Sequence, residues 1–166
     1  LHDLIDWVGC DATRYFLVAR APTSQLTFDV DLALARSNEN PVYYIQYAHA
    51  RCASVLRKAQ ETDSSFKVNE GLAHLGCLSE AETLALAITL GHFPEVVATA
   101  AERLEPHDVA NYLRDLAADF HSFYNAHKVL EGTAETMTAR LALVAATQQV
   151  IASGLGLLGV SAPDAM

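Results

Sequence analysis

Cysteine, glycine and proline are sparse in this chain, which has 3 Cys, 8 Gly and 5 Pro in 166 residues. Cys10, Cys52 and Cys77 are odd in number and far apart, so the sequence predicts neither a disulfide framework nor a zinc site. Reduced cysteines of this kind are typical of a cytosolic protein, and we expect a cytoplasmic location. The thinly scattered glycines and prolines exclude a collagen-like or low-complexity chain.

Positive charge is also in short supply, because 11 Lys and Arg face 20 Asp and Glu and leave a net charge of -9. This acidic balance argues against a general nucleic-acid binder with a broad basic face, although it leaves room for a local basic patch. Hydrophobic residues make up 51% of the chain, which is enough for the core of one domain and excludes disorder.

Neither a signal peptide nor a membrane span is predicted. The chain opens with Leu1 and an acidic amphipathic stretch, where a signal peptide would have a basic segment before an apolar block. The most apolar run, residues 141–160, is interrupted by Thr147 and Gln148, so we expect no membrane partner. Because the first residue is not Met, we expect a piece of a longer protein.

Strand signals are nearly absent, whereas apolar residues recur at helical spacing along the chain, so the sequence predicts an all-α bundle of five or six helices. Asn40 and Pro41 are typical of a helix start, and residues 79–82 resemble a capping box that begins with Ser79. A polar loop is expected from Gln60 to Ser65. The expected helical segments are residues 1–19 near the N-terminus and then six helices, residues 29–36, 41–59, 80–90, 94–104, 106–128 and 134–158.

Catalytic and metal-binding patterns are not found. The seven histidines lack the spacing of metal ligands, and no Ser/His/Asp set or paired-carboxylate motif stands out, so we expect no metal and no catalytic residue. Residues 154–159 match the dinucleotide fingerprint by letter. They follow a helix, where the fingerprint requires a preceding strand, and we therefore interpret them as a helix end.

One segment, residues 40–51, carries an unusual pattern. With about 100° per residue, Tyr44, Tyr47, Arg51 and Lys58 form a stripe that lies opposite an aliphatic side led by Ile45 and Leu56. Aromatic rings and cations are what unstacked RNA bases and phosphates bind. The same stripe also fits a helix buried on both sides or a protein interface. For an RNA platform we expect partly exposed tyrosine rings and a buried aliphatic side.

The same segment resembles the first helix of the anticodon-binding domain of arginyl-tRNA synthetases: Asn40-Pro41-Val42-Tyr43-Tyr44-Ile45-Gln46-Tyr47-Ala48-His49-Ala50-Arg51. Other blocks are similar to that family in the same order. They are residues 8–17, 28–33, 104–107, 120–125, 139–144 and 156–163.

The resemblance implies a class Ia synthetase anticodon-binding domain. Residues 1–28 would be a remnant of the junction with the catalytic domain, and residues 29–166 the α-helical anticodon-binding domain. Arginine tRNA would be bound through its anticodon loop. By position, the family's binding residues correspond to Tyr44, Tyr47, Arg51, Tyr124 and Met166, and the stripe adds Lys58.

Two departures from the family limit what this chain would do. The signatures His-Ile-Gly-His and Lys-Met-Ser-Lys are missing, so the chain is expected to be a non-catalytic C-terminal fragment without a cofactor. ATP with Mg would belong to the catalytic domain of the parent chain, which we expect to be a monomer. The family often ends Pro-Glu-Arg-Met, whereas this chain ends Pro163-Asp164-Ala165-Met166.

Two alternatives remain open. One is an all-α protein-interaction module without RNA contact. The other is the equivalent domain of another class I synthetase, such as the cysteinyl or methionyl enzyme. The tyrosine-rich helix after Asn40-Pro41 and the matching C-terminal blocks favour the arginyl family.

Overall fold

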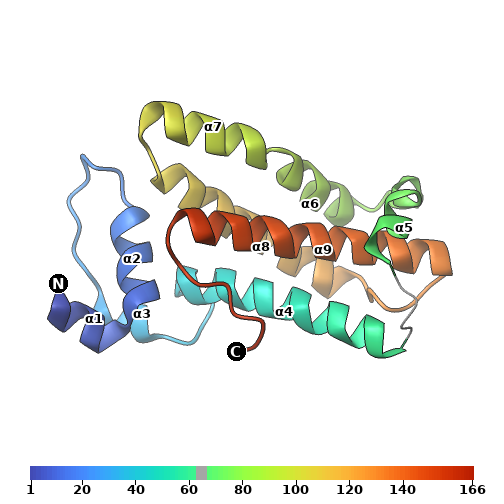
Figure 1. The fold of residues 1–166 in the computed structure, drawn as a ribbon, viewed down its shortest axis with the longest axis horizontal. Coiled ribbons are helices and arrows are strands. Elements are labelled where there is room, and N and C mark those ends of the chain that lie inside the picture. Colours follow the sequence, from blue (N-terminus) through green and yellow to red (C-terminus); the bar gives the residue numbers. More distant parts are fainter. Residues whose placement is uncertain (63–66) are drawn as a thin grey trace.

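A computed structural model describes residues 1–62 and 67–166, and within these ranges the chain is entirely helix and loop (Figure 1). Helix makes up 72% of this part, which confirms the prediction of an all-α bundle. The α-helices are α1 (His2–Val8), α2 (Cys10–Val18), α3 (Val30–Leu34), α4 (Pro41–Thr62), α5 (Val68–Leu72), α6 (Ala81–Gly91), α7 (Phe93–Arg103), α8 (His107–Ala126) and α9 (Ala134–Leu157), with a 3-10 turn, η1 (Leu75–Cys77).

The three longest helices, α4, α8 and α9, run side by side and form the centre of the molecule (Figure 1). Helices α6 and α7 pack along α8, and α5 packs on α9. Helices α1 to α3 lie together at one end, near the first turn of α4. This arrangement leaves α4 packed between its neighbours on one side and open on the other.

The core is formed by apolar side chains that the three long helices point at one another. Ile45 of α4, Phe120 and Phe123 of α8, and Ile151 of α9 have no measurable exposure. Gly154 allows α8 and α9 to approach closely, because a Cβ at this position would lie 2.7 Å from the Leu113 side chain. Burial of these residues fixes which face of α4 and α8 remains for binding.

Several predicted helix ends are confirmed by their hydrogen bonds. The Asn40 side chain accepts from the backbone N–H groups of Val42 and Tyr43, at 3.2 Å and 3.4 Å, and so caps α4. Thr133 caps α9 in the same way through the N–H of Thr136. Helix α4 continues to Thr62, beyond the predicted end, and the rest of the predicted loop, residues 63–65, lies outside the described residues.

Two predictions about helix boundaries are wrong. The first predicted helix is divided at Gly9, whose φ of 84° is accessible to glycine and ends α1 before α2 begins. The capping box at Ser79 does not form, because Glu80 occupies the N-cap position of α6. Its carboxylate accepts from Arg140 of α9 at 2.9 Å, a tertiary contact that the local pattern could not reveal.

More helices are present than the five or six expected. The break at Gly9 adds one, and the short elements α5 and η1 are too brief to show a 3.6-residue period.

The division of the chain at residue 28 stays a prediction. Tyr15 of α2 is buried in the same core as the long helices and donates to the carbonyl of Ala110 at 3.3 Å.

The fingerprint-like glycines end a helix, as predicted. Gly154 and Gly156 lie inside α9, and Gly159 follows it with a φ of 67°. Val160 N–H then donates to the Leu155 carbonyl at 2.9 Å, and Gly159 N–H donates to the Gly156 carbonyl at 3.0 Å, which is a Schellman ending. The chain reverses there and runs back across α4 (Figure 1).

One described segment, Ala81–Arg103, is long and apolar enough to cross a membrane by length and composition, with a mean hydropathy of 1.4. The segment is divided into α6 and α7 around His92. Only 11% of its most apolar window is buried, and Leu84 and Ile88 of α6 are exposed.

Candidate nucleic-acid interface

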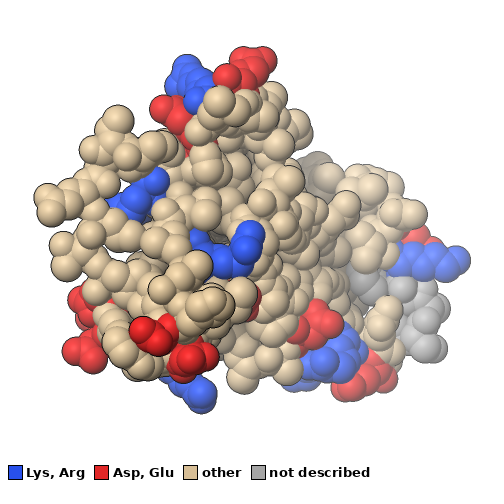
Figure 2. All heavy atoms as spheres, turned by 60° about the vertical axis from the view of Figure 1, so that its left-hand side comes forward, with Lys and Arg blue, Asp and Glu red and all other residues tan. Residues whose placement is uncertain are grey.

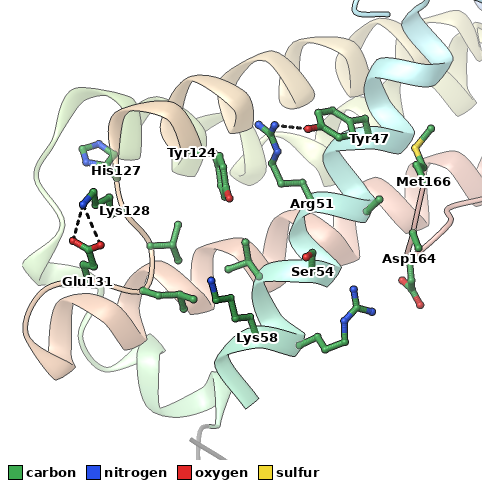
Figure 3. Close-up of a pocket in the computed structure, with 16 residues that line it drawn as sticks. Tyr47, Arg51, Ser54, Lys58, Tyr124, His127, Lys128, Glu131, Asp164 and Met166 are labelled. Atoms are coloured by element: carbon green, nitrogen blue, oxygen red, sulfur yellow. Dashed lines mark hydrogen bonds and ion pairs between the residues drawn. The ribbon is translucent and has the colours of Figure 1, made fainter. Parts of the chain in front are cut away.

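A groove of about 720 Å³ opens beside the exposed side of α4 (Figure 3). Helix α4 forms one wall, the end of α8 and the turn after it form a second, and residues 164–166 form a third. Five of the six predicted binding residues line it, and Tyr44 does not. Those five are Tyr47, Arg51, Lys58, Tyr124 and Met166.

Arg51 lies between two aromatic rings. Its guanidinium carbon is 4.5 Å from the ring centre of Tyr47 and 4.5 Å from that of Tyr124. Nη2 of Arg51 also donates to the Tyr47 hydroxyl at 2.5 Å. Tyr47 precedes Arg51 by one helical turn, whereas Tyr124 reaches it from α8, so two helices hold one cation (Figure 3). All three side chains are half-buried and remain accessible from the groove.

His121 of α8 closes the inner side of this arrangement. Nη1 of Arg51 donates to Nδ1 of His121 at 3.2 Å, so the proton of the neutral ring is on Nε2. The Tyr44 and Tyr47 rings pack on the imidazole, with centres 4.6 Å and 5.6 Å away. Burial and the nearby Arg51 charge lower the pKa of His121 to about 4, against a smaller opposing effect of the Tyr44 backbone.

This shift predicts an acid-sensitive fold. Between pH 6.5 and pH 4 the unfolded chain binds a proton at His121 that the folded chain does not, so the free energy of unfolding falls as the pH is lowered through this range. Thermal unfolding from pH 7.5 to pH 5 should show a smaller loss of Tm in His121→Phe than in the parent chain. Equal losses in the two proteins would contradict the assignment.

Tyr44 is separated from the groove by its packing. It lines a second cavity of about 450 Å³, together with Tyr15, Arg20 and Arg114. Its ring is half-buried against the hydrophobic core, and burial raises the pKa of its hydroxyl. The helical wheel therefore placed Tyr44 on the correct side of α4 but could not show that its ring packs on His121 of α8 and faces a different cavity. Ile45 is buried as expected, while Leu56 is only half-buried.

The tail is held over α4 by polar contacts. Asp11 of α2 accepts hydrogen bonds from the backbone N–H and hydroxyl of Ser161 and from Gln46. His49, a buried residue of α4, donates from Nδ1 to the Pro163 carbonyl at 2.9 Å. These contacts bring Met166, which is 57% exposed, to the rim of the groove.

Arg57 and Lys128 also line the groove, and neither was predicted from the sequence. Lys128 follows Tyr124 by four positions in the turn after α8, and it pairs with Glu131 at 3.1 Å. Arg57 is next to Lys58 in the sequence, so this second cation could have been predicted from its neighbour. Acidic side chains are present too, since Glu131 and Asp164 line the same groove. On the face shown in Figure 2, basic and acidic groups are interspersed without one broad basic area.

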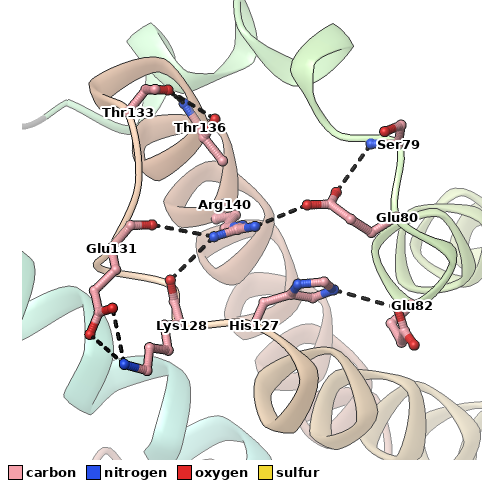
Figure 4. A network of polar contacts seen from close by, with 9 residues as sticks. All are labelled: Ser79, Glu80, Glu82, His127, Lys128, Glu131, Thr133, Thr136 and Arg140. Carbon is pink, nitrogen blue, oxygen red and sulfur yellow. Dashed lines mark hydrogen bonds and ion pairs between the residues drawn. The ribbon is translucent and has the colours of Figure 1, made fainter.

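The second wall of the groove is braced by Arg140 of α9 (Figure 4). Its guanidinium donates to the carbonyls of Lys128 and Glu131, both at 3.3 Å, and to the Glu80 carboxylate at 2.9 Å. The pKa of Glu80 is lowered by backbone hydrogen bonding and by Arg140. A single cation, mostly shielded from solvent, therefore fixes the turn that carries Lys128 to the start of α6.

One group of potential metal ligands exists among the described residues. Ligand atoms of Glu105, His107 and Asp108 lie within 4.8 Å of one another at the start of α8. They are close because they are neighbours in the chain, and none of them lines the groove.

The arrangement of the groove itself, two rings around a cation with further cations at the rim, suits a base and its phosphates.

Comparison with known families matches residues 45–166 to the DALR anticodon binding domain. An arginine–tRNA ligase from Albidiferax ferrireducens is 50% identical over all 166 residues, which cover 29% of that protein. The Thermus thermophilus arginyl-tRNA synthetase structure is 38% identical, with a TM-score of 0.80 over 96% of this chain and 27% of its own. A Campylobacter jejuni protein assigned as an arginyl-tRNA synthetase is 32% identical, with a TM-score of 0.87 over 99% of this chain and 35% of its own. The chain thus spans about a third of the length of these relatives.

Proposed function

This chain belongs to the DALR anticodon-binding domain family, and from that premise we propose that it binds the anticodon loop of an arginine tRNA. The observation that carries the proposal is the position of Arg51 between the Tyr47 and Tyr124 rings at the floor of an open groove. We expect an unstacked base to stack on the part of these rings that Arg51 leaves uncovered, while the guanidinium supplies donors to the base edge or to a phosphate.

The cations at the rim complete the proposed RNA contact. Lys58 and Arg57 are exposed on α4, and within the described residues neither is held in an ion pair. We expect them to meet phosphates on either side of a base in the groove, with Met166 as an apolar contact at the opposite rim. The carboxylates of Glu131 and Asp164 would repel phosphates that enter in another register.

The proposal extends to the parent protein. We place this domain in an arginine–tRNA ligase that joins arginine to its tRNA with ATP and Mg, by analogy with the Albidiferax relative. The chemistry would belong to the catalytic domain of that chain, which would act as a monomer in the cytoplasm. The role of residues 1–28, whose α2 packs on the bundle, would be to join the two domains rigidly.

Direct RNA binding tests the proposal. The chain is expected to bind a fluorescent arginine tRNA transcript more tightly than an alanine tRNA transcript, because only the former presents the matching anticodon bases. With three or four phosphate contacts, the logarithm of the affinity should fall against the logarithm of the salt concentration with a slope of about -2 to -3. Equal binding of both transcripts, or no binding at low salt, would contradict the proposed function.

Two tyrosines that the sequence treated alike should behave differently. Tyr47→Ala is expected to weaken tRNA binding by about 5- to 150-fold, since one stacking ring is worth about 1–3 kcal/mol. Tyr44→Ala should chiefly lower the free energy of unfolding, by about 2 kcal/mol, because its ring is packed on the core and on His121. Tyr44→Phe, which keeps the ring, is the matched control. The reverse pattern would place the RNA at the second cavity.

The protein-interaction alternative has one observation in its favour. Leu84 and Ile88 project from α6 with 48% and 60% exposure, on a helix that is apolar for most of its length. We expect Leu84→Ser and Ile88→Ser to bind arginine tRNA as tightly as the parent chain. That result would show that α6 takes no part in RNA binding, and α6 would stay available for a protein partner.

A further inference from the structure

His121 is a buried polar residue whose hydrogen bonding is only half satisfied. The side chain is 7% exposed, and its Nδ1 accepts from Arg51. Its Nε2 is buried and makes no hydrogen bond of good geometry, although the Tyr44 backbone lies close enough to raise the pKa of the ring slightly. An orphan buried donor costs stability, so a phenylalanine of nearly the same shape would suit packing better. The hydrogen bond that Nδ1 accepts from Arg51 therefore explains why an imidazole occupies this position.

We propose that His121 is a positioning residue for RNA binding, whose unprotonated Nδ1 orients the Arg51 guanidinium in the plane between the Tyr47 and Tyr124 rings. The proposal rests on the proposed function of the groove. His121 itself does not line the groove and need not contact the RNA. It acts by accepting one Arg51 N–H and leaving the others to face the ligand.

The geometry explains why an acceptor is required behind the arginine. A guanidinium held only by stacking can rotate in its plane and slide along the rings, because the attraction between a cation and a ring is weakly directional. Two hydrogen bonds from different nitrogens, Nη2 to the Tyr47 hydroxyl and Nη1 to His121, remove that freedom. A pre-oriented cation loses less entropy when the RNA binds.

The contact between His121 and Arg51 also makes the orientation of the Arg51 guanidinium dependent on pH. The titratable groups that pack against the imidazole are Arg51, Tyr44 and Tyr47, all from α4, and its aromatic neighbour on α8 is Phe120. Within the described residues no carboxylate pairs with the imidazole, so a protonated ring would face the Arg51 cation without a compensating negative charge. Protonation would replace an acceptor with a like charge and push Arg51 out of its plane.

Substitutions at His121 and Arg51, singly and combined, test the proposal in the 166-residue chain. His121→Phe keeps the ring volume without the acceptor, His121→Asn offers an amide oxygen near the position of Nδ1, and Arg51→Ala is combined with each. The affinity for an arginine tRNA transcript at pH 7.5 should fall about tenfold in His121→Phe and recover at least partly in His121→Asn. Arg51→Ala should then cost clearly less in the His121→Phe background than in the parent chain.

Nuclear magnetic resonance of the RNA-free chain separates this proposal from the proposed function. The His121 ring nitrogens should show an unprotonated Nδ1 at pH 7, and exchange broadening of the Arg51 guanidinium signals should increase in His121→Phe. A protonated Nδ1, or additive losses of affinity in the double variant, would overturn the positioning role. Failure of the parent chain to bind the transcript, with the expected ring signals intact, would overturn the proposed function and with it the RNA role of His121.

Discussion

Replacing Arg51 with alanine is expected to weaken binding of an arginine tRNA transcript by about 50-fold at physiological salt. The variant loses a charged donor to the RNA, which is worth about 1.5–3 kcal/mol, and the cation that holds the Tyr47 and Tyr124 rings apart. Fewer counterions are released as well, so the salt slope should become shallower by about 0.7. Fluorescence titration at several salt concentrations measures both effects.

Arg103→Ala is the matched control, because it removes the same charge from an exposed position at the end of α7, away from the groove lining. It should change the affinity by less than about twofold. Melting curves should show both variants folded, with Arg51→Ala within a few degrees of the parent. Similar losses of affinity in the two variants would mean that the RNA responds to net charge and not to the groove.

Replacing Gly71 with alanine is expected to cost about 3 kcal/mol of unfolding free energy, at the upper end of overpacking effects. A Cβ on Gly71 would overlap the backbone carbonyl of Thr138 and lie 2.9 Å from the Ala142 Cβ, so α5 would have to move away from α9. Backbone atoms of a central helix cannot yield as a flexible side chain can. For a chain of this size the Tm should fall by about 6–12 °C.

Gly76→Ala, in the neighbouring turn η1, provides the comparison. Nothing lies within 4 Å of a Cβ at that position, so its unfolding free energy should change by less than about 0.5 kcal/mol. If Gly71→Ala has the same Tm as the parent chain, α5 does not unfold together with the rest of the bundle. That result would contradict its assignment to the bundle.

Local patterns predicted those parts of the molecule that depend on neighbours in the chain. The Asn40 cap, the helix start at residue 134 and the stripe of Tyr47, Arg51 and Lys58 all follow from the sequence of one helix or turn. The failed capping box at Ser79 has a different cause. Glu80 occupies the N-cap position of α6, and its carboxylate accepts from Arg140, sixty positions away in the sequence, a partner that no local rule contains.

The candidate site shows the same division. A helical wheel gives the direction of a side chain but not the depth to which neighbouring helices cover it, so Tyr44 and Tyr47 were not distinguished. His121 was invisible as a partner of Arg51, because the contact depends on how α4 packs against α8. Met166 lies in an irregular tail, and only the family resemblance pointed to it.

The tail that crosses α4 has a consequence for the order in which the groove assembles. The turn that carries Lys128 is fixed by Arg140, only 12 positions away, whereas the tail depends on contacts between residues 114 to 150 positions apart. Contacts of such long range form late in folding, after the helices that they join are in place. Two walls of the groove should therefore exist in a folding intermediate or a partly opened native state that still lacks the third. Amide exchange should find residues 160–166 less protected than α4, α8 and α9, and bound RNA should slow their exchange most.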